Sequence, residues 1–201
     1  PGFPGNKPDE HGMAYLETTR GCPLSCAYCR YPHFRRRVTF LAPKAIAQRV
    51  TALKARGARE IRLIDPTFNT HPAFVKVLTL LAQLNADHRI KFFAELLADR
   101  LTPGQADLLE SAHFTEIEVG LQSRDPSVLK QIGRPTNLAK LDQGVRRLTN
   151  RNIKVTLDVM YGLPGQTLDE VLSTLRRVTR QPRVNPQCLQ TLLLPGTSLR
   201  E

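Results

Sequence analysis

The sequence predicts an α/β fold, a partial (βα)6 barrel of the TIM-like kind. Strand-like and helix-like patterns alternate along almost the whole chain of 201 residues, which implies a parallel sheet with right-handed crossovers. A loop with three cysteines follows the first expected strand, and polar residues lie at the ends of later ones. In such folds the chemistry lies at the carboxyl ends of the strands. A doubly wound open sheet is the alternative architecture.

The chain divides into a short linker and one domain. The first 12 residues are rich in proline and glycine, which is typical of a linker. The domain is expected to span 13–201, a length that can bury a sizeable core. Its first strand is expected over 13–18, directly before the cysteines.

The first helix is expected over 43–56. Pro43 suits the first turn of a helix, where its missing N–H is not needed. Gly57 is a plausible C-terminal cap. The spacing of the apolar residues forms one buried face. That face consists of Ile46, Val50 and Leu53.

The remaining elements alternate in the same way. Further strands are expected at 60–65, 89–95, 115–120, 153–160 and 186–194. Further helices are expected at 73–85, 103–111, 126–132, 138–150 and 168–180. Cys188 falls within the last strand, and we expect it in the core because free cysteines are often buried.

Composition narrows the class of protein. The chain is 41% hydrophobic and 23% charged, which is ordinary for a globular domain. No apolar run approaches the roughly 18 residues that a membrane span needs. The chain begins with Pro1 and carries no signal-peptide pattern. We therefore expect a fragment of a longer protein with flanking domains.

The net charge of +11 would fit nucleic-acid binding. However, the basic residues are scattered, and the dense run at 35–37 has no interleaved aromatic residues for base stacking. We therefore expect a small-molecule or peptide substrate rather than a nucleic acid.

Cys22, Cys26 and Cys29 form a C-x3-C-x2-C pattern in one loop. Three soft thiolates suit a zinc or iron–sulfur site. Both kinds of site usually take four protein ligands, so a set of three leaves one metal position open. His33 keeps a Cys3His zinc site as the competitor, in a zinc-stabilised nucleic-acid-binding module. Clustered free cysteines indicate a reducing compartment, here the cytoplasm.

The stretch TTRGCPLSCAYC at 18–29 resembles the signature of the radical S-adenosylmethionine (SAM) superfamily. The resemblance implies a radical SAM barrel whose three cysteines ligate a [4Fe–4S] cluster, with SAM on the open iron. It also implies one-electron cleavage of SAM, supplied by a donor such as flavodoxin or ferredoxin. The resulting 5′-deoxyadenosyl radical would abstract hydrogen from a substrate. Tyr28 would flank the adenine of SAM.

Three more stretches resemble oxygen-independent coproporphyrinogen dehydrogenase and its relatives. They are VGLQS at 119–123, IGR at 132–134 and DVMYGLPGQT at 158–167.

This closer resemblance implies which residues of the chain contact SAM. Gln122 and Asp158 match the residues that hold the ribose hydroxyls, and a cis-diol needs such acceptors and donors. Arg134, twelve residues after the glutamine, matches the arginine that pairs with the carboxylate. Glu95 matches the glutamate that helps to hold the amino group. The alternative for each residue is a solvated polar group at a strand end.

A third resemblance concerns cobalamin. DPTFN at 65–69 is similar to a form found in cobalamin-binding members, in which Asp65 would contribute charge near the SAM ammonium. YLETTRGC at 15–22 and LPGT at 194–197 are common in enzymes with an N-terminal cobalamin domain. Such a domain would lie before Pro1 and would make the protein a methyltransferase. Without cobalamin, a porphyrinogen-type oxidation is implied. The sequence singles out no catalytic residue on the substrate side.

Overall fold

The computed structural model describes residues 7–31 and 37–201. The predictions that involve His33, Arg35 and Arg36 fall outside these residues.

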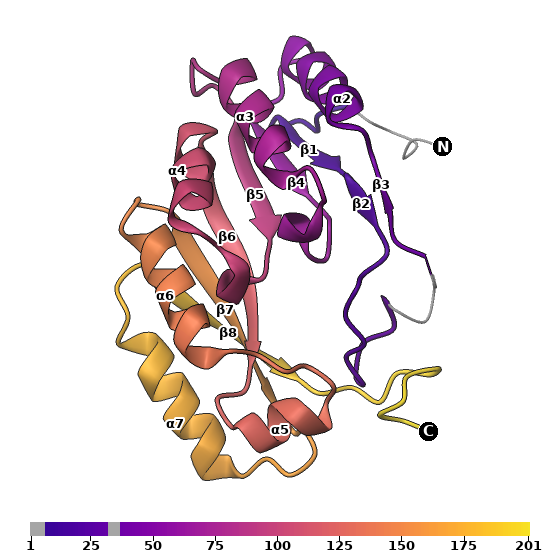
Figure 1. Cartoon of the computed structure of the whole chain (residues 1–201), viewed down its shortest axis with the longest axis vertical. Coiled ribbons are helices and arrows are strands. Elements are labelled where there is room, and N and C mark those ends of the chain that lie inside the picture. Colours follow the sequence, from indigo (N-terminus) through magenta and orange to yellow (C-terminus); the bar gives the residue numbers. More distant parts are fainter. Residues whose placement is uncertain (1–6, 32–36) are drawn as a thin grey trace.

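A parallel sheet of six strands forms the centre of the molecule (Figure 1). Its strands, in spatial order, are β1 (Met13–Leu16), β4 (Glu60–Leu63), β5 (Lys91–Glu95), β6 (Phe114–Gln122), β7 (Lys154–Tyr161) and β8 (Val184–Gln190). The strands lie in chain order and β1 and β8 form the edges, so the barrel is open. This order confirms the partial barrel and makes the doubly wound alternative wrong.

The helices cover one side of the sheet, as Figure 1 shows. They are α2 (Pro43–Ala55), α3 (Phe74–Leu84), α4 (Pro103–Ser111), α6 (Leu138–Thr149) and α7 (Leu168–Thr179). The short helix α5 (Pro126–Gln131) lies near the carboxyl end of β6, and two single turns are η1 (Phe68–Thr70) and η2 (Ala98–Arg100). No helix among the described residues is both long and apolar enough to cross a membrane.

The two faces of the sheet differ in polarity because successive side chains of a strand point to opposite sides. Toward the helices, β4 presents Ile61 and Leu63, both fully buried in the core. Its alternate residue Arg62 lies on the inner face, where its guanidinium stands 3.6 Å from the centre of the Phe93 ring. The inner face of a parallel sheet is usually apolar as well. Polar residues on this inner face therefore indicate a binding or catalytic site.

A second, two-stranded sheet was not expected from the sequence. The strand β2 (Thr19–Arg20) pairs antiparallel with β3 (Thr39–Phe40). This hairpin forms the stem of the cysteine loop.

The last strand corrects one prediction. Cys188 is exposed, not in the core. Of the residues in β8, Val184 alone is buried, because this strand is at the edge of the sheet and has one neighbour. The strand also ends at Gln190 rather than at Leu194.

Candidate functional site

A cavity of about 280 Å³ lies at the carboxyl ends of the strands, beside the cysteine loop. It contains most of the residues that the sequence singles out. They are Cys22, Cys26, Tyr28, Cys29, Glu95, Gln122, Arg134 and Asp158. Glu118 and Thr67 line the same cavity, and the sequence reasoning had missed both as site residues.

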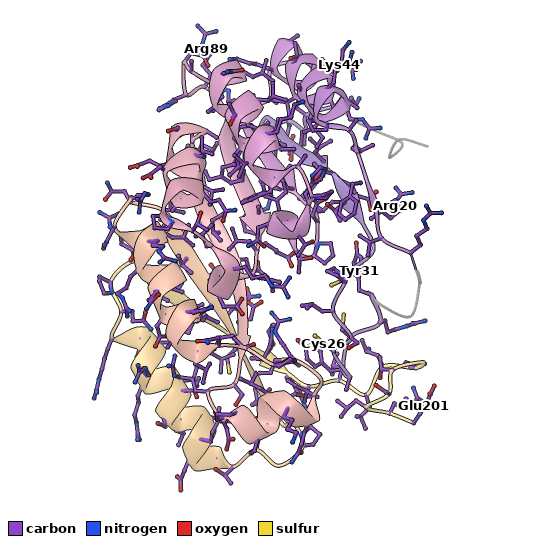
Figure 2. All side chains as sticks on the ribbon, viewed as in Figure 1. Arg20, Cys26, Tyr31, Lys44, Arg89 and Glu201 are labelled. Atoms are coloured by element: carbon purple, nitrogen blue, oxygen red, sulfur yellow. The ribbon has the colours of Figure 1, made fainter. Side chains whose placement is uncertain are left out.

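The cysteine loop rests on two distant parts of the chain. The Ala27 N–H donates to the Ile132 carbonyl at the end of α5 (2.9 Å), and the Leu199 N–H donates to the Ala27 carbonyl (2.9 Å). Figure 2 shows Cys26 between the sheet and the C-terminal segment. Cys26 is buried and the other two cysteines are half-buried. Burial raises the pKa of the Cys22 and Cys29 thiols, so metal loading there releases protons.

The cysteines line a cavity rather than meeting at one point. Within the described ranges, no three His, Cys, Asp or Glu side chains converge closely enough to hold one metal ion. A cluster of four irons spreads its ligands further apart than a single zinc ion does. The donor set of three thiols around an open cavity fits such a cluster.

Gln122 has an unusual backbone. Its φ is +67°, in the left-handed region, next to a bulge between Gly120 and Gln122 in the pairing of β6 with β7. Such a conformation costs about 1–3 kcal/mol outside glycine. It turns the side chain toward the cavity, where 6% of the residue is exposed.

Arg134 reaches the cavity from the end of α5. One terminal nitrogen, Nη2, donates to the Gly120 carbonyl (2.9 Å), and Nη1 approaches the Cys26 sulfur (3.5 Å). The Nε of Arg134 and the Oε1 of Gln122 are buried with no hydrogen-bond partner in the described part of the chain. A ligand in the cavity could satisfy both atoms.

Three carboxyl groups crowd the inner wall of the cavity on neighbouring strands. Glu95 on β5 is paired in register with Glu118 on β6, and Asp158 lies on β7. Burial, followed by repulsion from Glu118, raises the pKa of Glu95 to about 7 and that of Asp158 to about 8. Asp158 also accepts a hydrogen bond from Gln187 (3.3 Å). This wall therefore favours a ligand that carries positive charge.

Glu118 could have been found in the sequence. In a strand, residues two apart share a face. Glu118, Gly120 and Gln122 follow this spacing along β6, although the bulge shifts the last of them.

Asp65 differs from the other predicted site residues in its surroundings. Its carboxylate is fully buried and does not line the cavity. It accepts hydrogen bonds from the Thr18 N–H (2.7 Å), the Thr19 N–H (3.0 Å) and the Thr18 hydroxyl. The side chain thus holds the start of the cysteine loop and is not available to a ligand.

The fold and the cavity are those expected of an enzyme domain that binds a metal centre through thiolates. Residues 16–178 match the family model of the Radical SAM superfamily. The chain therefore belongs to the radical SAM superfamily.

Curated relatives share this region. A tRNA-2-methylthio-N(6)-dimethylallyladenosine synthase from Desulfosudis oleivorans is 30% identical over 179 residues, covering 84% of this chain and 38% of the relative. An enzyme of the same name from Syntrophotalea carbinolica is 27% identical over 208 residues, covering 98% of this chain and 47% of the relative. The chain thus spans less than half the length of these relatives.

Solved structures share the fold. The radical SAM methyltransferase TsrM from Kitasatospora setae, with cobalamin and a [4Fe–4S] cluster, matches with a TM-score of 0.85 and 19% identity, over 93% of this chain and 36% of that one. Coproporphyrinogen III oxidase (HemN) from Escherichia coli matches with a TM-score of 0.66 and 16% identity, over 91% of this chain and 45% of that one. At these identities the likeness concerns the fold alone.

Proposed function

We propose that this chain is the catalytic domain of a radical SAM enzyme, with a [4Fe–4S] cluster on Cys22, Cys26 and Cys29. The observation that carries the proposal is the pair of unpartnered buried atoms, Gln122 Oε1 and Arg134 Nε, in the wall of the cysteine-lined cavity. Each such atom costs about 1–3 kcal/mol unless a ligand supplies its partner. When bound, the cluster and SAM supply an electron and a 5′-deoxyadenosyl radical that removes hydrogen from the substrate.

The residues around the cavity match the groups of SAM. The unpartnered Nε–H of Arg134 is free to donate to the carboxylate, and Glu95 offers a carboxylate to the ammonium. Gln122 and Asp158 supply acceptors for the ribose hydroxyls. Tyr28, half-buried beside the cysteines, flanks the adenine. The positive charge of SAM offsets the repulsion among the carboxylates.

Anaerobic reconstitution tests this proposal against the zinc alternative. With iron and sulfide, the full-length protein should turn brown and bind about four irons per chain. After reduction by dithionite or a flavodoxin, it should convert SAM to methionine and 5′-deoxyadenosine. A colourless protein with one zinc ion would contradict the proposal.

Two reactions are candidates for the full-length enzyme, and each has an observation in its favour. The curated relatives are named as tRNA-2-methylthio-N(6)-dimethylallyladenosine synthases, which favours methylthiolation of a tRNA base. The DPTFN stretch at 65–69 and the likeness to TsrM favour cobalamin-dependent methyl transfer to a small molecule or peptide. A coproporphyrinogen-type oxidation has the weaker structural likeness.

Mass spectrometry of the products separates these reactions. Reconstituted full-length protein should be incubated with SAM, dithionite, a sulfide source and either total tRNA or a small-molecule extract of cells, with and without added cobalamin. A methylthio-modified nucleoside that forms without cobalamin supports methylthiolation. A requirement for cobalamin supports methyl transfer and excludes the first reaction.

A further inference from the structure

The two ends of the cysteine loop are attached to one short segment, 65–71, which follows β4, whereas the middle of the loop rests on Ile132 and Leu199. The hairpin of β2 and β3 closes the loop, but its strands contain two residues each. So short a ladder is weak by itself. The contacts that fix the two ends of the loop therefore come from elsewhere.

Asp65 fixes the start of the loop. It is fully buried and accepts its hydrogen bonds from two successive backbone N–H groups, those of Thr18 and Thr19, and from the Thr18 hydroxyl. Cys22 follows three residues after Thr19. The position of the first cysteine thus depends directly on this carboxylate.

His71 fixes the end of the loop. Its Nδ1 accepts from the Ala73 N–H (3.1 Å), so the neutral ring carries its proton on Nε2 and donates to the Leu41 carbonyl (2.9 Å). The Leu41 N–H in turn donates to the Thr18 carbonyl (2.8 Å). Both ends of the loop are therefore joined to one another and to the same segment.

The segment also borders the cavity. Pro66 and Thr67 line it together with Cys22, and the Thr67 hydroxyl acts to lower the pKa of the Cys22 thiol against the larger effect of burial. One stretch of seven residues thus contacts the cysteine loop, a cysteine side chain and the space beside it. A ligand that orders this stretch also orders the loop.

We propose that Asp65 is a positioning residue for the cluster, and that it couples retention of the cluster to binding of SAM. The inference rests on the proposed function, because it needs a cluster on the three cysteines. Groups that orient metal ligands typically contribute about 10–100-fold to metal affinity. Coupling of this kind is reciprocal, so SAM should slow loss of the cluster just as the cluster favours SAM.

Three variants of the reconstituted full-length protein test the proposal. Asp65→Ala removes all three hydrogen bonds, whereas Asp65→Asn keeps an oxygen that can accept from both backbone N–H groups. Asn85→Ala is the matched control. Asn85 is also fully buried and makes three hydrogen bonds, to Ile90 (2.7 and 3.0 Å) and Ala112 (3.0 Å), on the side of the sheet remote from the cavity.

The readouts are iron per chain, the rate at which the cluster bleaches in air with and without SAM, and thermal unfolding of the metal-free protein. Asp65→Ala should bleach about tenfold faster or more and lose most of the protection by SAM. Asp65→Asn should restore both properties. Asn85→Ala should lower the unfolding temperature but leave bleaching near the wild-type rate.

Three results would overturn the proposal. The first is that the cluster of Asp65→Ala bleaches at the wild-type rate. The second is that the cluster of Asn85→Ala bleaches as fast as that of Asp65→Ala, which would mean that any loss of stability exposes the cluster. Failure of Asp65→Asn to restore bleaching would also count against it. If Asp65→Ala does not fold, Thr18→Val removes the hydroxyl donor alone and should shift bleaching in the same direction. Wild-type protein that binds no iron would instead refute the proposed function.

Discussion

Gly120 offers the sharpest test of how the cavity holds SAM. A Cβ atom at this position would lie 2.6 Å from Arg134 Nη2 and closer still to Gln122 Nε2. Both are the far ends of flexible side chains, so they can move without displacing the backbone. The φ of Gly120 is not in the left-handed region, so alanine fits the backbone itself. Gly120→Ala should therefore change the cavity and leave the fold intact.

The size of the effect follows from the bonds that are lost. Displacing Arg134 breaks its hydrogen bond to the Gly120 carbonyl (2.9 Å) and moves its Nε away from the position we propose for the carboxylate of SAM. A hydrogen bond to a charged group is worth about 1.5–3 kcal/mol. At about 1.4 kcal/mol per tenfold, the dissociation constant of SAM should rise about 10–100-fold.

Isothermal titration of SAM into anaerobically reconstituted protein measures this change, and thermal unfolding measures the fold. Gly144→Ala is the matched control, because a Cβ there would lie 2.7 Å from the Ala98 carbonyl carbon. That backbone cannot yield easily, so this variant should lose about 1–3 kcal/mol of stability with little change in affinity per folded molecule. Unchanged SAM affinity in Gly120→Ala would refute the placement of both Gln122 and Arg134.

Four further predictions follow from the structure. Arg134→Ala should weaken SAM about 10–100-fold while iron content stays at the wild-type level; loss of iron would show that the arginine serves the cluster instead. The pKa of Glu95 is about 7 and that of Asp158 is about 8 in the absence of ligand, so both groups gain negative charge as pH rises through this range. The affinity for the positively charged SAM should therefore rise with pH. An affinity that does not change with pH would contradict the placement of SAM beside Glu95 and Asp158. Because folding raises the pKa values of Glu95 and Asp158, the metal-free fold gains stability at low pH that is lost progressively as pH rises from about 4, the ordinary pKa of these groups, to about 8; Asp158→Asn should flatten this decline in the unfolding temperature. Cys188→Ser should leave iron content and unfolding temperature unchanged, because this thiol is exposed and absent from the cavity lining; a loss of iron would make it a ligand.

Helices and strands were predicted well where the sequence contains local signals such as capping residues or a clear hydrophobic period. The helix expected at 103–111 has those bounds because Pro103 suits its first turn and Thr102 and Gln105 form a capping box. The hairpin of β2 and β3 was missed because two-residue strands show no periodicity. Cys188 was misplaced because periodicity identifies a strand but not whether that strand lies at an edge.

Some features of the site could likewise be predicted from the sequence and others could not. The spacing of the cysteines and of Gln122 and Arg134 indicated residues that do line one cavity. The role of Asp65 could not be read from the sequence, because its partners Thr18 and Thr19 are more than 40 residues away along the chain, at the start of the cysteine loop. The left-handed backbone of Gln122 was equally hidden, since glutamine has no preference for that conformation.

The contacts of Ala27 have a consequence for the order of assembly. Its carbonyl is bound by Leu199 and its N–H binds Ile132, so the loop that carries the cysteines contacts residues made much later on the ribosome. Contacts between distant parts of a chain form late, because the intervening chain must be ordered first. The cysteine loop, although near the start of the described chain, should therefore reach its final shape among the last parts of the domain. Iron delivered during synthesis would meet three thiols that are not yet held together.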